Sequence, residues 1–250
     1  MGPDLHVFAI PGIPDVGASD DLSALITNAL KRCTRAVDAG DVFVVAQKIV
    51  SKAEGAIVRL DDVEPSPLAH QWAAAYNKDP RAVEVVLRES RRIVRMERGI
   101  VIAETRHGFV CANAGVDASN VPLGFVTVLP ADPDASAARL RNALEASCGC
   151  QVGVIIADTF GRPWREGAVN VALGVSGVRA LLDYRGCRDP YGRRLESTMI
   201  ALADELASAA EIVMRKMART PVAIVRGVAE WCGCGVGREL VREAVRDLFR

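Results

Sequence analysis

The chain has 250 residues, half of them hydrophobic, which is enough to bury a large core in one domain or in two lobes. Lysine plus arginine and aspartate plus glutamate each number 31, so the net charge is zero. This balance argues against general nucleic-acid binding, whose affinity comes mainly from neutralising phosphates. Because no apolar run reaches the length of a membrane span and the start lacks a signal-peptide layout, we expect no membrane partner and a cytoplasmic protein.

Seven cysteines in a chain without an export signal argue against a disulfide framework. Two Cys-Gly-Cys pairs, Cys148/Cys150 and Cys232/Cys234, raise the alternative of a four-thiolate zinc site. Thiolate ligands of zinc are usually separated by two to four residues, not by one. We therefore expect reduced cysteines.

The first part of the chain predicts two strands and a helix. Residues 5–10 form a short apolar strand that two prolines and a glycine end, and residues 22–37 have helical periodicity. Residues 42–46 are continuously apolar, as in a buried central strand. Lys48 and Lys52 follow this strand at its exit, where α/β proteins bind ligands, so they can meet phosphates. Solvated lysines at a strand edge are the alternative.

The rest of the chain mixes helices with closely spaced strands. Helical patterns cover residues 65–76, 80–89, 135–146, 195–217 and 238–249, and strand patterns cover residues 93–94, 100–103, 108–112, 124–129, 152–157 and 221–225. The short turns between residues 93 and 129 suggest antiparallel pairing, whereas the buried runs at 42–46, 152–157 and 221–225 belong to a central sheet. We therefore predict a mixed, α+β fold.

Two acids, Asp117 and Asp158, each follow an apolar strand and precede a glycine-containing or polar loop. One or two carboxylates completed by phosphate oxygens are how Mg²⁺ and Mn²⁺ are usually held. Thr159 adds a hydroxyl beside Asp158. The alternative is that both acids only form turns, since Asp, Ser, Asn and Gly are common turn residues.

The sequence contains no standard nucleotide-binding motif and no clear nucleophile with its base. The phosphate-loop pattern of ATPases does not occur, and the glycines at 233, 235 and 237 have the wrong spacing for a dinucleotide loop. His107 and Cys111 have no partner base in the sequence, so we interpret them as structural.

Taken together, the loops resemble those of the coenzyme F420-0:γ-L-glutamate ligases. The matching segments lie in the family's order over nearly the whole chain: Ile-Pro-Gly-Ile-Pro at 10–14, Lys-Ile-Val-Ser-Lys at 48–52, His-Gly-Phe-Val-Cys-Ala-Asn-Ala-Gly-Val-Asp-Ala-Ser-Asn at 107–120, Asp-Thr-Phe-Gly-Arg-Pro-Trp-Arg at 158–165, Arg-Asp-Pro-Tyr-Gly at 188–192 and Pro-Val-Ala-Ile-Val-Arg-Gly at 221–227. The segments around Asp117 and Asp158 are the most specific.

The resemblance implies a GTP-dependent ligase that attaches L-glutamate to the lactyl carboxylate of coenzyme F420-0, a phosphodiester-linked deazaflavin, and then adds γ-linked glutamates. It implies a single catalytic unit spanning residues 1–250 with two lobes of discontinuous boundaries, which forms a homodimer and uses Mg²⁺ or Mn²⁺, with two ions expected. The implied metal ligands are Asp117, Asp158 and Thr159, and the implied nucleotide contacts are Ile13, Pro14, Asp15, Val16, Gln47, Lys52 and Asn120. Because transfer of the γ-phosphoryl group would give an acyl phosphate, we also expect cations at the site from Lys48, Arg162 and Arg165.

Two departures from the family pattern bear on the function. Gln47 stands where a serine or threonine is common, and Arg215 follows Val213-Met214 where glycine is usual. They motivate two alternatives, a paralogous nucleotide-dependent amide ligase with another carboxylate acceptor and a non-catalytic protein that binds nucleotide or metal.

Overall fold

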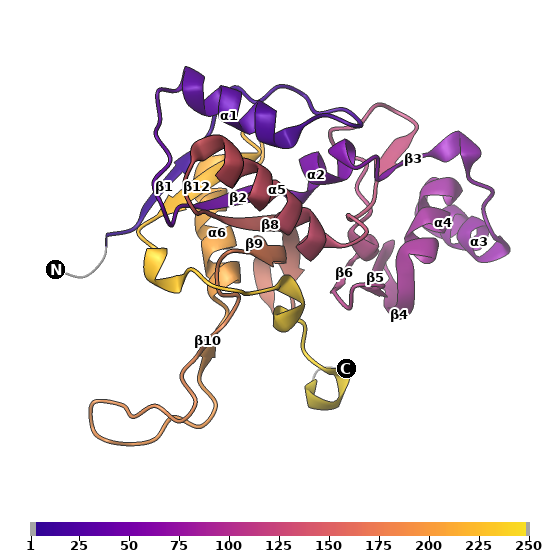
Figure 1. Cartoon of the computed structure of the whole chain (residues 1–250). Helices are drawn as coiled ribbons and strands as arrows, with labels where there is room; N and C mark the ends of the chain where they lie inside the picture. The colour runs from indigo at the N-terminus through magenta and orange to yellow at the C-terminus, as the bar shows by residue number, and fades with distance from the viewer. Residues whose placement is uncertain (1–3, 249–250) are drawn as a thin grey trace.

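A five-stranded sheet forms the centre of the protein, in a computed structural model that describes residues 4–248. The strands lie in the order β1-β12-β2-β8-β9 (Figure 1). Their bounds are β1 His6–Ala9, β12 Val222–Arg226, β2 Val42–Ala46, β8 Gly153–Arg162 and β9 Arg165–Ser176. Strands β2 and β8 are parallel, and the other neighbours are antiparallel.

Helices cover both faces of this sheet (Figure 1). Alternate residues of β2 point to opposite faces, because side chains alternate along a strand. Phe43 and Val45 pack with α1 (Leu22–Arg32), α2 (Gln47–Ala53) and α5 (Pro133–Cys148). Val42 and Val44 pack with α6 (Leu202–Met214). The continuous apolar runs of the sequence are therefore explained by burial on both faces of the sheet.

A smaller set of elements packs beside the sheet. Strands β4 (Ser90–Glu97), β5 (Ile100–Thr105) and β6 (Val110–Ala112) form an antiparallel sheet, as predicted, and β3 (Ile57–Arg59) pairs with β7 (Phe125–Thr127). Two helices join them, α3 (Pro67–Tyr76) and α4 (Pro80–Glu89). The predicted α+β class is confirmed, and the division of the chain into two lobes stays a prediction.

Four of the predicted helices begin at side-chain caps. The carboxylates of Asp21, Asp79 and Asp132 and the hydroxyl of Ser66 accept a hydrogen bond from a backbone N–H of the first turn of α1, α4, α5 and α3. Proline occupies an early position in three of these helices, where its missing N–H costs nothing.

An arm projects from the sheet between β9 and α6. It contains the two-residue strands β10 (Leu182–Asp183) and β11 (Met199–Ile200), and its loop reaches away from the rest of the molecule (Figure 1). Tyr191, in this loop, is 96% exposed. The arm explains why α6 begins at residue 202 and not at 195, as the periodicity predicted.

Two further predictions from the sequence were wrong. The strand predicted over residues 152–157 continues to Arg162, so Asp158 lies inside β8 and not in a loop after it, because β9 pairs with this whole stretch. Residues 47–52, which follow the strand at 42–46 as expected, form helix α2, which was not predicted from the sequence. The helix predicted over residues 238–249 is absent from the described part of that range, which has only the short 3-10 turns Gly237–Leu240 and Ala244–Arg246, and residue 249 lies outside the described residues.

No helix within residues 4–248 combines the length and the apolar character that crossing a bilayer requires.

Candidate active site

The site lies where the parallel strands β2 and β8 reach their carboxyl ends. Ala46 pairs with Ala157 at this point, the last pair of the two strands. Beyond it the chains diverge, because β2 turns into α2 whereas β8 continues along β9. Ligand sites in open α/β sheets form at such ends. Here the divergence brings Lys48 of α2 close enough to Asp158 of β8 to act on its charge.

Lys48 is paired with Asp117. Its Nζ lies 2.8 Å from Asp117 Oδ2 and donates a 2.5 Å hydrogen bond to Ser119 Oγ. The Ser119 N–H and hydroxyl donate to the two carboxylate oxygens of Asp117 at 2.6 and 3.0 Å. Burial raises the pKa of Asp117, but these hydrogen bonds outweigh burial and hold the pKa below its usual value. Asp117 is thus an ionised carboxylate, which is the state that the predicted role as a metal ligand requires.

A strained turn positions Asp117. Asn113, Ala114 and Gly115 have positive φ angles of 52°, 51° and 74° in succession. A Cβ on Gly115 would lie 2.7 Å from Leu129 Cγ, so the turn needs glycine there. Asp117 then exchanges two backbone hydrogen bonds with Thr127, at 3.0 and 2.8 Å. Such strain is retained where the surrounding structure holds it and is common at functional sites.

Asp158 has a pKa that is shifted in the opposite direction from that of Asp117. Burial raises its pKa to about 6, the Thr159 N–H lowers it, and the nearby Asp117 carboxylate raises it further. Lys48 and Lys216 act in the opposite direction. The structure therefore brings Asp117 and Asp158 together, as the metal prediction requires. Two nearby carboxylates of this kind are stabilised by a cation between them.

Thr159 and Asp158 leave β8 on opposite faces of the sheet. The Thr159 hydroxyl donates a 2.8 Å hydrogen bond to Asn170 Oδ1, and Asn170 Nδ2 donates to Glu211 Oε2 at 3.2 Å. Glu211 belongs to α6, on the other side of the sheet from α5. The role of Thr159 as a metal ligand stays a prediction, and its hydroxyl is engaged on the α6 side.

The loop predicted to bind nucleotide is anchored by two of its residues. Ile13 and Val16 are buried in the main core, whereas Pro14 and Asp15 are exposed. Farther along, the Ser19 N–H donates to the Ala53 carbonyl at the end of α2, which ties the loop to that helix. The loop can present backbone groups and Asp15 to a ligand while its apolar side chains stay in the core.

The other predicted nucleotide residues differ in accessibility. Gln47 is 2% exposed, and its Oε1 has no hydrogen-bond partner among residues 4–248. Lys52 lies one turn after Lys48 on α2, so the two ammonium groups share a face of the helix. Asn120 is exposed in the turn after Asp117, with a φ of 59°. Their contacts with nucleotide stay predictions.

Arg162 and Arg165 lie at the tip of the β8–β9 hairpin, away from Asp158. Arg162 lies four residues after Asp158 along the strand, which corresponds to roughly 13 Å. The Arg162 guanidinium donates to the Gly167 and Glu166 carbonyls of its own hairpin, and Arg165 is exposed. The structure does not bring these two cations to the carboxylates, so their catalytic role stays a prediction.

Sequence reasoning did not identify two residues at the site, Ser119 and Lys216. Ser119 holds Asp117, and its position two residues after an aspartate is typical of an Asx turn, a signal that was present. Lys216 follows α6 and acts on Asp158 only through the tertiary fold, which no local pattern reveals.

Cys111 and His107 have surroundings that agree with the structural roles expected from the sequence. Burial, with the nearby Asp158 charge, raises the pKa of the Cys111 thiol to about 12, so it stays protonated. His107 Nε2 lies 3.0 Å from the Pro130 carbonyl. All seven cysteines are free, and neither Cys-Gly-Cys pair belongs to a metal-binding cluster among residues 4–248.

The donor set fits Mg²⁺ or Mn²⁺ bound together with phosphate. No group of three His, Cys, Asp or Glu side chains converges anywhere in residues 4–248, so two carboxylates are the core of the candidate site. Mg²⁺ typically binds through one or two carboxylates and completes its shell with water and substrate phosphates, whereas zinc prefers nitrogen and sulfur ligands.

Known proteins match the chain over nearly its full length. A sequence model of the family described as F420-0:Gamma-glutamyl ligase matches residues 12–227. The chain is 49% identical to the Coenzyme F420:L-glutamate ligase of Methanopyrus kandleri, over 99% of this chain and 98% of the other. It is 46% identical to the protein of the same name from Methanothermobacter thermautotrophicus, over 98% and 99%, and 39% identical to that of Archaeoglobus fulgidus, over 98% and 96%. With these matches and the paired carboxylates, the chain belongs to the F420-0:gamma-glutamyl ligase family of enzymes.

Proposed function

We propose that this ligase joins L-glutamate to the lactyl carboxylate of coenzyme F420-0 through an amide bond, and then adds glutamates through γ-linked amides at the expense of GTP. The observation that carries the proposal is the convergence of Asp117, Asp158 and Lys48 at the ends of β2 and β8. It occurs in a chain 49% identical to a protein named Coenzyme F420:L-glutamate ligase.

The reaction needs an activated carboxylate, because a carboxylate is a poor acyl donor at neutral pH. An oxygen of the acceptor carboxylate attacks the γ-phosphorus of GTP, the bond to the bridging oxygen breaks, and GDP leaves. The glutamate amine then attacks the acyl carbon of the acyl phosphate, loses a proton and expels inorganic phosphate. Water must be excluded meanwhile, because it would hydrolyse the acyl phosphate.

Lys48 and Lys52 stabilise charge in this mechanism. Their ammonium groups lie on one face of α2, and Lys48 is only 17% exposed in its side chain. A cation that is shielded from water acts more strongly on the equatorial oxygens of a phosphoryl group in transfer. Arg162 and Arg165 could stabilise the same phosphoryl oxygens only if the tip of the β8–β9 hairpin moved toward Asp158.

Asp117 and Asp158 would hold Mg²⁺ or Mn²⁺, with Thr159 as a further ligand to a second ion. A divalent cation at this place would neutralise negative charge on the β- and γ-phosphates. The nucleotide itself would contact the backbone of residues 13–16, Gln47, Lys52 and Asn120, which border α2 or the Asp117 turn.

The decisive experiment measures phosphate release from GTP. Turnover should require L-glutamate, F420-0 and Mn²⁺ or Mg²⁺ together, and mass spectrometry should detect F420 with added glutamates. If GTP turns over with L-glutamate and another carboxylate but not with F420-0, the acceptor assignment is wrong. If ATP replaces GTP at equal kcat/KM, the nucleotide assignment is wrong.

A different carboxylate acceptor is a second candidate, which one observation favours. Gln47 is buried next to Lys48, and its carboxamide oxygen has no hydrogen-bond partner within the described range, residues 4–248. Such an oxygen costs free energy unless a ligand donates to it. A donor on the substrate would remove that cost, and the same phosphate-release assay with a panel of carboxylates tests this alternative.

We also infer a homodimer that works in the cytoplasm. Tyr191 and Tyr184 are 96% and 41% exposed on the arm between β9 and α6. Aromatic side chains exposed together on an extended arm are typical of contacts between subunits. The seven free cysteines agree with a reducing compartment.

A further inference from the structure

A cavity of about 310 Å³ lies beside Asp117, between α3, α4 and β5. Most of its wall is apolar and includes Trp72, Val86 and Val101. Binding sites for small molecules have volumes of about 300–1,000 Å³ and mostly apolar linings with a few polar groups. The cavity therefore suits a flat, largely apolar group, and an apolar wall does not suit a triphosphate or a free dicarboxylic amino acid.

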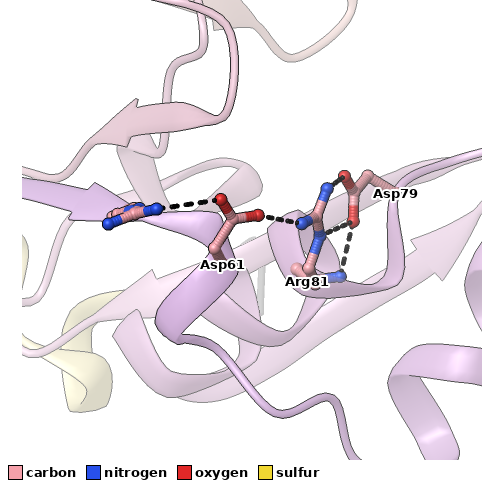
Figure 2. A network of polar contacts seen from close by, with 4 residues as sticks. Asp61, Asp79 and Arg81 are labelled. Atoms are coloured by element: carbon pink, nitrogen blue, oxygen red, sulfur yellow. Dashed lines mark hydrogen bonds and ion pairs between the residues drawn. The ribbon is translucent and has the colours of Figure 1, made fainter.

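The polar groups of the cavity favour a ligand with acceptor atoms. Its lining includes Asp79, whose carboxylate accepts hydrogen bonds from the backbone N–H and from Nε and Nη2 of Arg81, at 2.8, 3.1 and 2.8 Å (Figure 2). Arg81 also donates to Asp61 at 2.7 Å. The hydrogen bonds from Arg81 hold the pKa of Asp79 below its usual value, so this carboxylate is ionised and already neutralised.

Two donors in the lining remain free. Lys78 has no ion pair or side-chain hydrogen bond among residues 4–248. Asn113 accepts a 3.3 Å hydrogen bond from the Val101 N–H through Oδ1, while its amide nitrogen has no protein partner in the described chain. An ammonium and an amide N–H₂ in a cavity whose wall is mostly apolar match a ring whose edge carries carbonyl or ionised oxygen atoms.

The cavity is separate from two of the elements expected to bind nucleotide. These are α2 and the loop of residues 13–16, and neither contributes a residue to the cavity lining, whereas the turn that carries Asn120 contributes Asp117 and Ala118. Asp117 connects the cavity with the expected reaction centre, because it forms an ion pair with Lys48 of α2 and also lines the cavity. A substrate held in the cavity would thus reach the reaction centre from the α3–α4 side.

We propose that this cavity binds the flat heteroaromatic ring of the carboxylate acceptor. Trp72 lies against the ring, and Lys78 and Asn113 donate to the oxygen atoms at its edge. Trp72 is itself supported by Tyr76, whose ring centroid lies 4.3 Å away. Base–aromatic and ring–aromatic stacking of this kind is strong and tolerant of ring type. The proposal rests on the proposed function, since it assigns the ring-bearing substrate of that reaction.

Filling the cavity tests the proposal. Ala82 is a partly buried residue of α4 in the lining, so Ala82→Phe places a ring in the cavity. We expect the KM for F420-0 to rise at least about tenfold, with the KM values for GTP and L-glutamate within about twofold of the parent. Ala75→Phe, an exposed position of α3 outside the lining, is the matched control and should change none of them.

A binding measurement that needs no turnover separates this proposal from the proposed function. The deazaflavin-ribityl fragment, without phosphate or lactyl group, should quench tryptophan fluorescence in the parent, weakly in Ala82→Phe and not in Trp72→Phe. Unchanged quenching and an unchanged KM in a folded Ala82→Phe protein would overturn the proposal. Competition of the fragment with GTP would overturn it as well. An inactive parent enzyme that still binds the fragment through Trp72 would refute the reaction and leave the cavity assignment standing.

Discussion

The Nζ of Lys48 lies 2.8 Å from the carboxylate of Asp117, although 68 residues separate the two in the chain. The pair joins the start of α2 to the turn after β6. The pair keeps Asp117 ionised. Asp158, which lies on β8, has its pKa raised to about 6. Two carboxylates with such different surroundings should respond differently to mutation and to pH.

Replacing Asp117 by asparagine should remove divalent-cation binding and lower kcat at least about a hundredfold, because the ligand loses its charge. Calorimetry with Mn²⁺ and the phosphate-release assay measure the two effects. Asp62→Asn, at an exposed acid of the segment before α3, is the control and should be neutral. Parent-like Mn²⁺ affinity in a folded Asp117→Asn protein would disprove the metal assignment.

The metal-free protein should lose stability as the pH rises through about 6, because of Asp158. Burial raises its pKa from 3.8 to about 6, so between these values the folded protein keeps a proton that the unfolded chain has released. The free energy of unfolding then falls with rising pH in that window. Two pKa units correspond to about 3 kcal/mol.

Urea unfolding of the parent and of Asp158→Asn at pH 4.5 and pH 7 isolates this effect from other carboxyl groups. The parent should become less stable relative to the variant at the higher pH, and Mn²⁺ should reverse the difference, because the metal binds the ionised carboxylate. A difference that stays constant with pH would show that the Asp158 pKa is ordinary.

Arg215→Gly should raise the free energy of unfolding by about 1 kcal/mol, because Arg215 ends α6 with a φ of 53°, a region that favours glycine. Arg215→Ala removes the guanidinium but keeps the Cβ, so it should give no such gain. GTP titration of both variants tests the separate prediction that the charge of Arg215 affects nucleotide affinity. If GTP binds both variants as it binds the parent, Arg215 has no part in the nucleotide site.

The arm should control the oligomeric state. Tyr191→Asp introduces a charge at a side chain that is 96% exposed in the single chain, and light scattering should then detect monomers in place of dimers. Leu68→Asp, at an exposed residue of α3, serves as the control. A Tyr191→Asp protein that remains dimeric would place the interface elsewhere.

The sequence predicted the buried strands and most helices well, because their signals are local. The apolar run at β2 and the helix from Pro80 to Glu89, with its aspartate cap and proline, match the structure closely. The outer half of β8 could not be predicted, since the residues from Asp158 to Arg162 are polar or small apart from Phe160 and are extended through pairing with β9.

The residue types of the site could be predicted from the sequence, but which of these residues lie close together could not. Asp117, Asp158 and Lys48 stand out at the ends of strands, and the structure brings these three together. Arg162 is no less prominent in the sequence, yet its guanidinium is bound to carbonyls of its own hairpin. Which cations face the carboxylates depends on strand length, and this length is set by tertiary pairing.

The backbone segments that carry Asp117 and Asp158 differ in how firmly the fold holds them. Asp158 lies within a ten-residue strand of the central sheet, where its position follows from the register with β9. Within the part of the chain that the structure describes, the backbone of Asp117 is hydrogen-bonded to Thr127 alone, at the base of an exposed turn that runs through Asn120 to Leu123. One anchor of the site is therefore fixed and the other adjustable, so changes in the length or composition of this turn can retune the separation of the carboxylates without disturbing the core.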